Sequence, residues 1–154
     1  MDAYFVSSVL GSQVDLLVSP ECFQRFVLPG IRRLAAQARR HGLPVVMHSG
    51  GSIARVIPEL LAAGVEVLHP IQAKARGMDA ATLSSRYPGL VCMGGVDAQE
   101  LLPFGTPEQV EQKTRELQAL FGTRLILSPS HEKILPNIPP ENIEAIARGV
   151  GAAG

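Results

Sequence analysis

Residues 63–72 read AGVEVLHPIQ and contain the pattern that recurs along this chain. A helical segment ends at Gly64, a short apolar run follows, and His69 and Gln72 come at the end of that run. Continuous apolar runs of this length are typical of strands that are buried on both faces, as in parallel sheets. The stretch therefore predicts a helix that leads into a buried strand, with polar side chains at the strand's carboxyl end.

Other apolar runs have the same character, and helical patterns lie between them. The predicted strands cover residues 3–9, 44–48, 65–69, 90–94 and 124–128. The predicted helices cover residues 20–40, 52–63, a segment from Asp79 to just before Pro88, residues 106–121 and a last segment that opens at Pro139 and Pro140. We expect Pro58 to kink or divide the second helix. Strict alternation of strands and helices predicts parallel strands joined by right-handed crossovers.

Two architectures fit this alternation, namely a doubly wound sheet and part of a (β/α)8 barrel. A complete barrel needs about 250 residues, or roughly 31 for each strand–helix unit. The 154 residues of this chain therefore supply about five units. A doubly wound sheet would be complete with the strands predicted here, but no GxGxxG motif follows the first strand to mark a nucleotide site.

Composition argues against several classes of protein. The chain has 14 basic and 14 acidic residues, a balance that argues against a nucleic-acid partner or an anionic membrane surface. It has no apolar run of about 18 residues, and its acidic start differs from an export signal. Cys22 and Cys92 form no CxxC motif, so we expect reduced thiols in a cytoplasmic protein.

Polar side chains follow four of the predicted strands. They are His48, His69, Asp97 and His131, and the loops at the carboxyl ends of the strands add Ser12, Gln13, Gln72 and Gln99. Because the carboxyl ends of parallel strands lie on one face, where active sites of such folds form, we expect three imidazoles and a carboxylate around a shared opening. A single histidine at a strand end is more often a hydrogen-bonded structural residue, whereas three at equivalent positions favour a site.

The three histidines also suggest an alternative with a metal. His48, His69 and His131 offer the nitrogen ligands of a zinc site with an open position. No HxxxH or HxC spacing supports this alternative, so the sequence predicts no metal and no other cofactor. A serine hydrolase is not supported either, because the chain contains no GxSxG motif.

Several motifs occur in a recognisable order along nearly the whole chain. They include LVSPECF at 17–23, VVMHSGG at 45–51, AGVEVLHPIQ at 63–72, GMD at 77–79, GGVDAQ at 94–99, LPFGTPE at 102–108, PSH at 129–131 and PPENI at 139–143. Together they resemble the uroporphyrinogen decarboxylase family, which includes the haem-pathway decarboxylase and zinc-dependent corrinoid methyltransferases. The resemblance implies a TIM-type (β/α)8 barrel, with residues 1–154 as a single partial-barrel domain that forms its C-terminal part.

The resemblance also implies roles for single residues. His131 matches a histidine that the decarboxylases place in the substrate cleft, and Ser12 or Gln13 lies near the family's cleft serine. The methyltransferases resemble this chain at His48, in an HxC motif, and have a second cysteine near position 131. Here Gly50 stands in place of the first cysteine and His131 in place of the second.

From the resemblance we expect a carboxy-lyase of porphyrin biosynthesis that acts on a tetrapyrrole or a related acidic small molecule, and that is inactive as this chain alone. The expected catalytic residues are His131, which would orient a carboxylate or assist proton transfer, with His48 and Asp97. The expected substrate-binding residues are Ser12, Gln13, His69, Gln72 and Gln99. The alternatives are a zinc- and corrinoid-dependent methyltransferase-like protein and a non-catalytic, truncated assembly module.

The predicted sheet also bears on oligomeric state. Five parallel strands cannot close a barrel, and exposed strand edges invite pairing with another chain. We therefore expect a homo-oligomer or a complementing chain.

Overall fold

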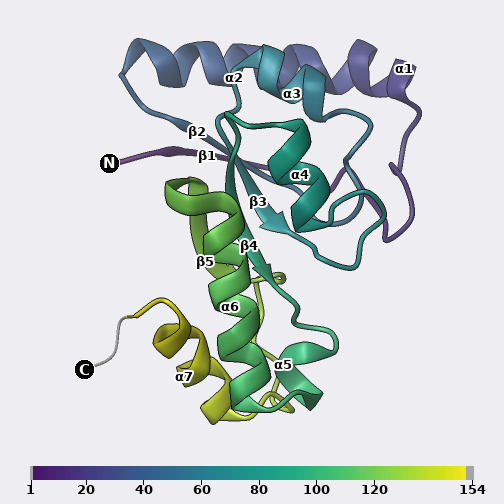
Figure 1. The fold of residues 1–154 in the computed structure, drawn as a ribbon. Helices are drawn as coiled ribbons and strands as arrows, with labels where there is room; N and C mark the ends of the chain where they lie inside the picture. The colour runs from purple at the N-terminus through teal and green to yellow at the C-terminus, as the bar shows by residue number, and fades with distance from the viewer. Residues whose placement is uncertain (1, 152–154) are drawn as a thin grey trace.

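A computed structural model describes residues 2–151 of the chain. Its centre is one parallel sheet of five strands in the order β1-β2-β3-β4-β5 (Figure 1). The strands are β1 (Tyr4–Ser7), β2 (Val45–His48), β3 (Val67–Ile71), β4 (Val91–Val96) and β5 (Leu125–Pro129). Strands that follow one another in space as they do in sequence are the arrangement of a barrel, whereas a doubly wound sheet reverses its order at a switch point. The fold is therefore part of a TIM-type barrel.

Helices connect the strands, as the alternation predicts. They are α1 (Pro20–Cys22), α2 (Leu28–Arg40), α3 (Ile57–Ala63), α4 (Ala80–Arg86), α5 (Leu101–Phe104), α6 (Pro107–Phe121) and α7 (Pro140–Gly149). A π-helical turn, η1 (Phe23–Val27), joins α1 to α2, and a 3-10 turn, η2 (Gly122–Arg124), follows α6. Figure 1 shows α2 and α3 together at one side of the sheet and α6 beside α7 at the other end. Among residues 2–151, no helix is long and apolar enough to cross a bilayer.

The predicted helix over residues 20–40 is present, but it is not regular. Ser19 caps its start, since its hydroxyl oxygen accepts a hydrogen bond from the Cys22 N–H at 3.2 Å. The π-helical turn ends two residues before Pro29, and the N–H of Leu28, which follows the turn, bonds to the Phe23 carbonyl. Proline has no N–H to continue the α-helical pattern, so a local change of winding at this point has a clear cause.

The expectation for residues 52–63 is wrong in its first half. The helix begins only at Ile57, and Pro58 therefore lies in its first turn, where a missing N–H costs nothing. Residues 52–56 instead form a loop that contacts the loop after β1, through a 2.6 Å hydrogen bond from the Ser52 N–H to the Ser12 carbonyl. The short helix α5 is a further element that the sequence reading did not include.

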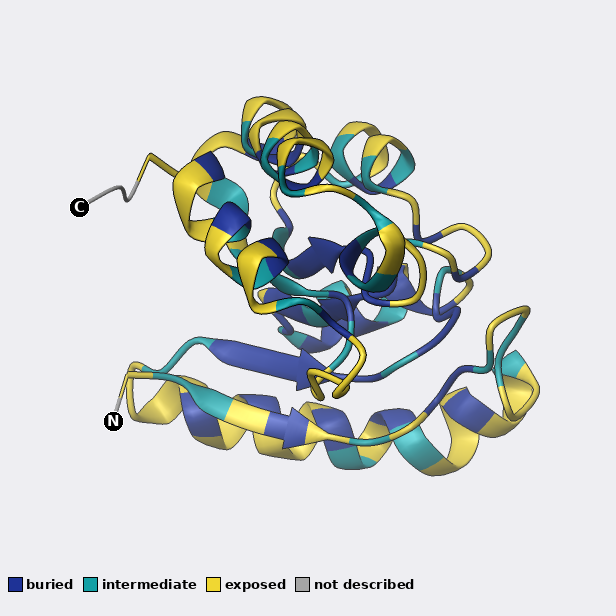
Figure 2. Cartoon of the chain, turned by 90° about the horizontal axis from the view of Figure 1, so that it is seen from below, coloured by how far each residue is buried: buried dark blue, intermediate teal, exposed yellow. Residues whose placement is uncertain are grey.

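The two faces of the sheet have different surroundings. Val6, Met47 and Cys92 point to the face that packs against the helices, and each is buried in the main hydrophobic core. On the opposite face, Phe5 remains 51% exposed and Ile126 45% exposed. Figure 2 shows the resulting contrast, with β2 buried along its length and β1 partly exposed. In a complete barrel this second face is the one that points to the interior.

Candidate functional site

Two histidines meet at the carboxyl end of the sheet. His48 ends β2 and is paired in register with His69 of β3, so both side chains lie on the face that carries Phe5. Their Nδ1 atoms are 2.9 Å apart, which is a hydrogen bond in which one ring donates and the other accepts. The Phe5 ring lies 6.1 Å from the His48 ring and 5.6 Å from the His69 ring, measured between centroids.

A carboxylate completes this pair. Glu132 follows β5, and its Oε1 atom lies 3.3 Å from Nε2 of His48. Burial and the neighbouring His48 hold the pKa of His69 below its usual 6.5, whereas Glu132 acts in the opposite direction. Glu132, His48 and His69 thus form a continuous series of contacting groups along which a proton can pass.

His131 occupies a different environment from the other two histidines. Its Nε2 atom lies 2.7 Å from the side-chain amide nitrogen of Gln72, and its Nδ1 atom lies 3.3 Å from the hydroxyl of Ser130. The Gln72 carbonyl oxygen accepts a hydrogen bond from the Gly51 N–H. The Ser130 hydroxyl oxygen accepts one from the Ala98 N–H at 3.1 Å. Both neighbours of the ring are therefore anchored to the backbone of other strand–helix loops.

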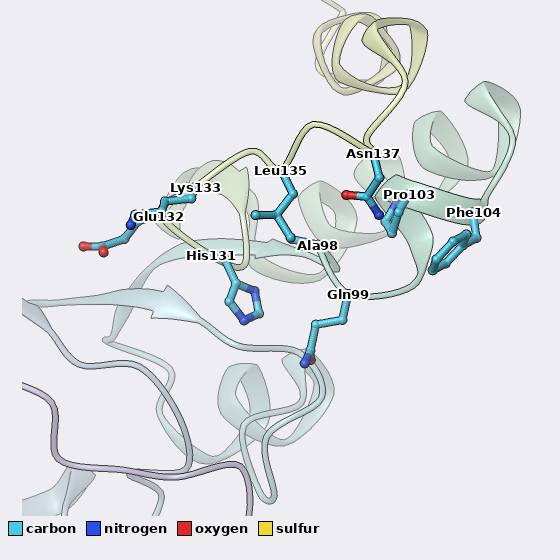
Figure 3. Close-up of a pocket in the computed structure, with 9 residues that line it drawn as sticks. All are labelled: Ala98, Gln99, Pro103, Phe104, His131, Glu132, Lys133, Leu135 and Asn137. Atoms are coloured by element: carbon cyan, nitrogen blue, oxygen red, sulfur yellow. The ribbon is translucent and has the colours of Figure 1, made fainter.

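A pocket of about 550 Å³ opens beside His131 (Figure 3). It is lined by Ala98, Gln99, Pro103, Phe104, His131, Glu132, Lys133, Leu135 and Asn137. Figure 3 shows the His131 ring and the Gln99 side chain projecting into the same space, whereas Glu132 points away from it. Apolar walls with a few polar groups are the usual composition of a small-molecule site.

Asp97 also lies at the carboxyl end of the sheet, but its hydrogen-bond partners are close to it in sequence. Its carboxylate accepts hydrogen bonds from the N–H groups of Gln99 at 2.9 Å and Leu101 at 3.4 Å, which places it at the start of α5. The Lys74 ammonium is 4.0 Å away. Within residues 2–151, its carboxylate makes no hydrogen bond to a histidine.

Ser12 and Gln13 lie in the loop after β1, and their contacts are also local. The Ser12 hydroxyl donates to the Asp15 carbonyl at 2.9 Å, and the Gln13 carbonyl accepts from the Arg76 N–H at 3.0 Å. This loop touches the loop after β2 closely, because a Cβ atom on Gly51 would collide with the Gly11 carbonyl. The Gly51 N–H in turn donates a hydrogen bond to the Gln72 side chain, which contacts His131. The loop after β1 is thus linked to His131 through Gly51 and Gln72.

The cysteines of this chain do not fit the zinc–thiolate site that the resemblance implies for methyltransferases. Cys92 points into the core from β4, where burial raises the pKa of its thiol to about 12, and Cys22 is exposed on α1. Gly50, which stands in place of the motif cysteine, has no donor atom. Over residues 2–151, no three histidine, cysteine or acidic side chains are arranged to hold a metal ion.

Comparison with known proteins supports the fold and the family. The family model for uroporphyrinogen decarboxylase matches residues 8–152. The chain belongs to the uroporphyrinogen decarboxylase family. Within this family it is similar to a methylated-thiol–coenzyme M methyltransferase of Methanosarcina mazei, with 30% identity over an alignment of 138 positions that covers 86% of this chain.

A solved structure gives the same fold. The chain resembles a methyltransferase from Methanosarcina mazei with a TM-score of 0.75 and 21% identity, over 98% of this chain and 42% of that chain. The match to the curated relative likewise spans 33% of the relative's length. The sequence prediction of a partial barrel in this family is thus confirmed.

The sequence predicted most of the residues at the carboxyl end of the sheet. It did not reveal three residues that affect the chemistry of this site. Phe5 could have been found from the strand pairing, because it stands two residues before the point where β1 lies beside His48. Glu132 and Ser130 flank His131, but nothing in their spacing shows that one contacts His48 and the other holds the His131 ring.

Proposed function

We propose that this chain belongs to a methyltransferase-type member of the family and binds a small acidic thiol, or its methylated form, in the pocket beside His131. The proposal is supported by the 30% identity with a relative that is named for a methylated thiol and coenzyme M. Because the match covers 33% of that relative, the activity of a whole protein of this kind is part of the proposal.

The composition of the pocket suits such a ligand. Pro103, Phe104 and Leu135 provide apolar surface for a methyl group on sulfur. Gln99, Asn137 and Lys133 provide amides and a cation for an acidic end. A ligand with one apolar and one anionic end would therefore be oriented by the two kinds of wall.

The observation that carries the proposal is the double position of Glu132. It borders the pocket, while its carboxylate points away from the cavity and contacts His48. The Glu132 side chain is 58% exposed, so its rotation would connect the pocket to the imidazole pair. A thiol reacts as its thiolate, which requires a base. In the proposed step the S–H bond breaks, its electron pair stays on sulfur, and the proton passes to the series formed by Glu132, His48 and His69. General-base assistance of this kind contributes about 10²–10⁴-fold to a rate.

No step of this proposal uses zinc, because the chain lacks the thiols of the HxC-type site. The proposal concerns only binding of the ligand and removal of its proton by residues of this chain.

A second candidate is the decarboxylase reading, and one observation favours it. Gly50 and His131 stand where the methyltransferases that this chain resembles have cysteines, so the edge of the sheet carries imidazoles without thiols. Imidazoles suit protonation of a ring and binding of substrate carboxylates, which decarboxylation of an acidic tetrapyrrole requires.

One titration series tests both candidates. The 15N-labelled chain is titrated with coenzyme M, with S-methyl coenzyme M and with a tetrapyrrole carboxylic acid, and the side-chain amide signals of Gln99 and Asn137 are followed. We expect the two sulfur compounds to shift these signals. Shifts caused by the tetrapyrrole alone would support the decarboxylase reading instead, and no shift with any compound would reject both.

The proton step needs its own measurement. The rate at which iodoacetamide alkylates bound coenzyme M reports removal of the thiol proton, and we expect Glu132→Gln to lower this rate. Glu100→Gln is the matched control, because Glu100 is an exposed glutamate that pairs with Lys74 and does not line this pocket. Equal alkylation rates in wild type and Glu132→Gln would contradict a role for Glu132 in taking the proton.

A further inference from the structure

The side chain of Gln72 lies between two groups whose hydrogen-bonding roles determine its orientation. Gln72 follows β3, is 6% exposed, and reaches the Gly51 backbone with one end of its amide and His131 with the other. A backbone N–H can only donate, so the oxygen of the amide must face Gly51. The NH2 group of Gln72 is therefore the end that faces His131.

This orientation determines the state of the His131 ring. The Gln72 NH2 group can only donate, and it lies 2.7 Å from Nε2 of His131, so this ring nitrogen must accept. A neutral ring that accepts at Nε2 carries its proton on Nδ1. Nδ1 lies 3.3 Å from the Ser130 hydroxyl oxygen, which is free to accept this proton.

We infer that Gln72 is a positioning residue that holds the His131 ring neutral, with its proton on Nδ1 and the lone pair of Nε2 occupied. A ring protonated on both nitrogens would place an N–H against the Gln72 NH2 group. Turning the amide over would place that NH2 group against the Gly51 N–H. Either arrangement sets two donors against each other and leaves a buried group unsatisfied, which is costly.

The inference changes the role expected for two residues. Gln72 acts through His131 and not as a direct substrate ligand. His131 presents its ring as a fixed wall of the pocket, with both nitrogens engaged, and the exchangeable proton of the site belongs to His48 and His69. The state of the ring is a property of the folded chain, so it can be tested independently of the proposed function.

The test is direct observation of the ring nitrogens. Long-range 1H–15N spectra of the labelled chain near neutral pH distinguish nitrogens that carry a proton from those that accept. The chain has four histidines, so single substitutions assign the signals. For His131 we expect an accepting Nε2 and a protonated Nδ1. A protonated Nε2 in the wild-type chain would overturn the inference. This measurement on the wild-type chain does not depend on whether any variant folds.

Two variants test the cause. Gln72→Glu replaces the NH2 donor with an oxygen, so the carboxylate can accept from both Gly51 and His131, and we expect the Nε2 signal to move to the protonated range. Gln99→Glu is the matched control, because it makes the same change in the pocket wall at a residue with no hydrogen bond to His131 among those described. An unchanged Nε2 signal in Gln72→Glu, or the same shift in both variants, would overturn the role of Gln72.

Discussion

The Nδ1 atoms of His48 and His69 lie 2.9 Å apart at the ends of neighbouring parallel strands. Parallel pairing without a register shift brings the two residues opposite each other, and the Phe5 ring covers them on the same face. His48 is buried and His69 is half-buried, and Glu132 is the acidic neighbour of His48. The pH dependence of the protein should therefore carry the signature of this pair.

We predict that stability falls as the pH is lowered from about 7 toward 5. The pKa of His69 is lower in the folded chain than its usual 6.5, chiefly because of burial. Between these two pKa values the unfolded chain binds more protons, so the free energy of unfolding rises with pH through this window and is lost on acidification. Urea unfolding of wild type and His69→Asn at several pH values measures the effect. The variant should show a weaker dependence than wild type, and His41→Asn, at an exposed histidine, should show the wild-type dependence.

We predict that Glu132→Gln lowers the pKa of His69 further. In the wild-type chain the Glu132 carboxylate raises this pKa and partly offsets burial and the charge of His48. Removing the negative charge leaves those two effects unopposed. A pH titration of the His69 ring signals measures the change, with Glu100→Gln as the control. A rise in the pKa of His69 would show that the carboxylate does not act on the pair as the structure indicates.

The sequence was sufficient to locate the strands because each is a short apolar run, and β2, β3 and β4 are also largely buried. It was not sufficient for residues 52–56, where the chain continues as a loop. There the Ser52 N–H bonds to the Ser12 carbonyl and the Ser52 hydroxyl to the Arg76 carbonyl at 2.7 Å. These partners are distant in sequence. Local helix signals therefore could not reveal that hydrogen bonds to them replace a helix at residues 52–56.

The same distinction applies to the site. That His48, His69 and His131 lie at one edge follows from parallel strands alone. The contact between His48 and His69 depends on the register of β2 and β3. The contact between Glu132 and His48 depends on the path of the loop after β5. An aspartate between a strand and a helix, such as Asp97, fits catalysis and helix capping equally well in sequence, and the structure shows its carboxylate bonded to the backbone at the start of α5.

We predict that Gly51→Ala destabilises the chain by about 1–3 kcal/mol, whereas Gly50→Ala changes stability by less than about 0.5 kcal/mol. Gly51 has a φ of +78°, and a Cβ atom there would collide with the backbone of Gly11 and Ser12. At Gly50 the same atom would meet only the Gln72 side-chain oxygen, at 3.7 Å. Urea unfolding of the two variants measures the difference, and equal values would show that the loops after β1 and β2 do not approach as closely as described.

We predict that the chain self-associates through the exposed sheet face and the strand edges at β1 and β5. Both edge strands have unpaired backbone groups on one side, and Phe5 and Ile126 leave about half of their surface in water. Ile126→Lys places a charge on this face and should shift the population toward monomer in light scattering. Phe26→Lys is the control, because Phe26 is 69% exposed in the π-helical turn, away from the strands, and its replacement should leave the oligomeric state unchanged. A wild-type chain that is a single monomeric species at high concentration would contradict the prediction.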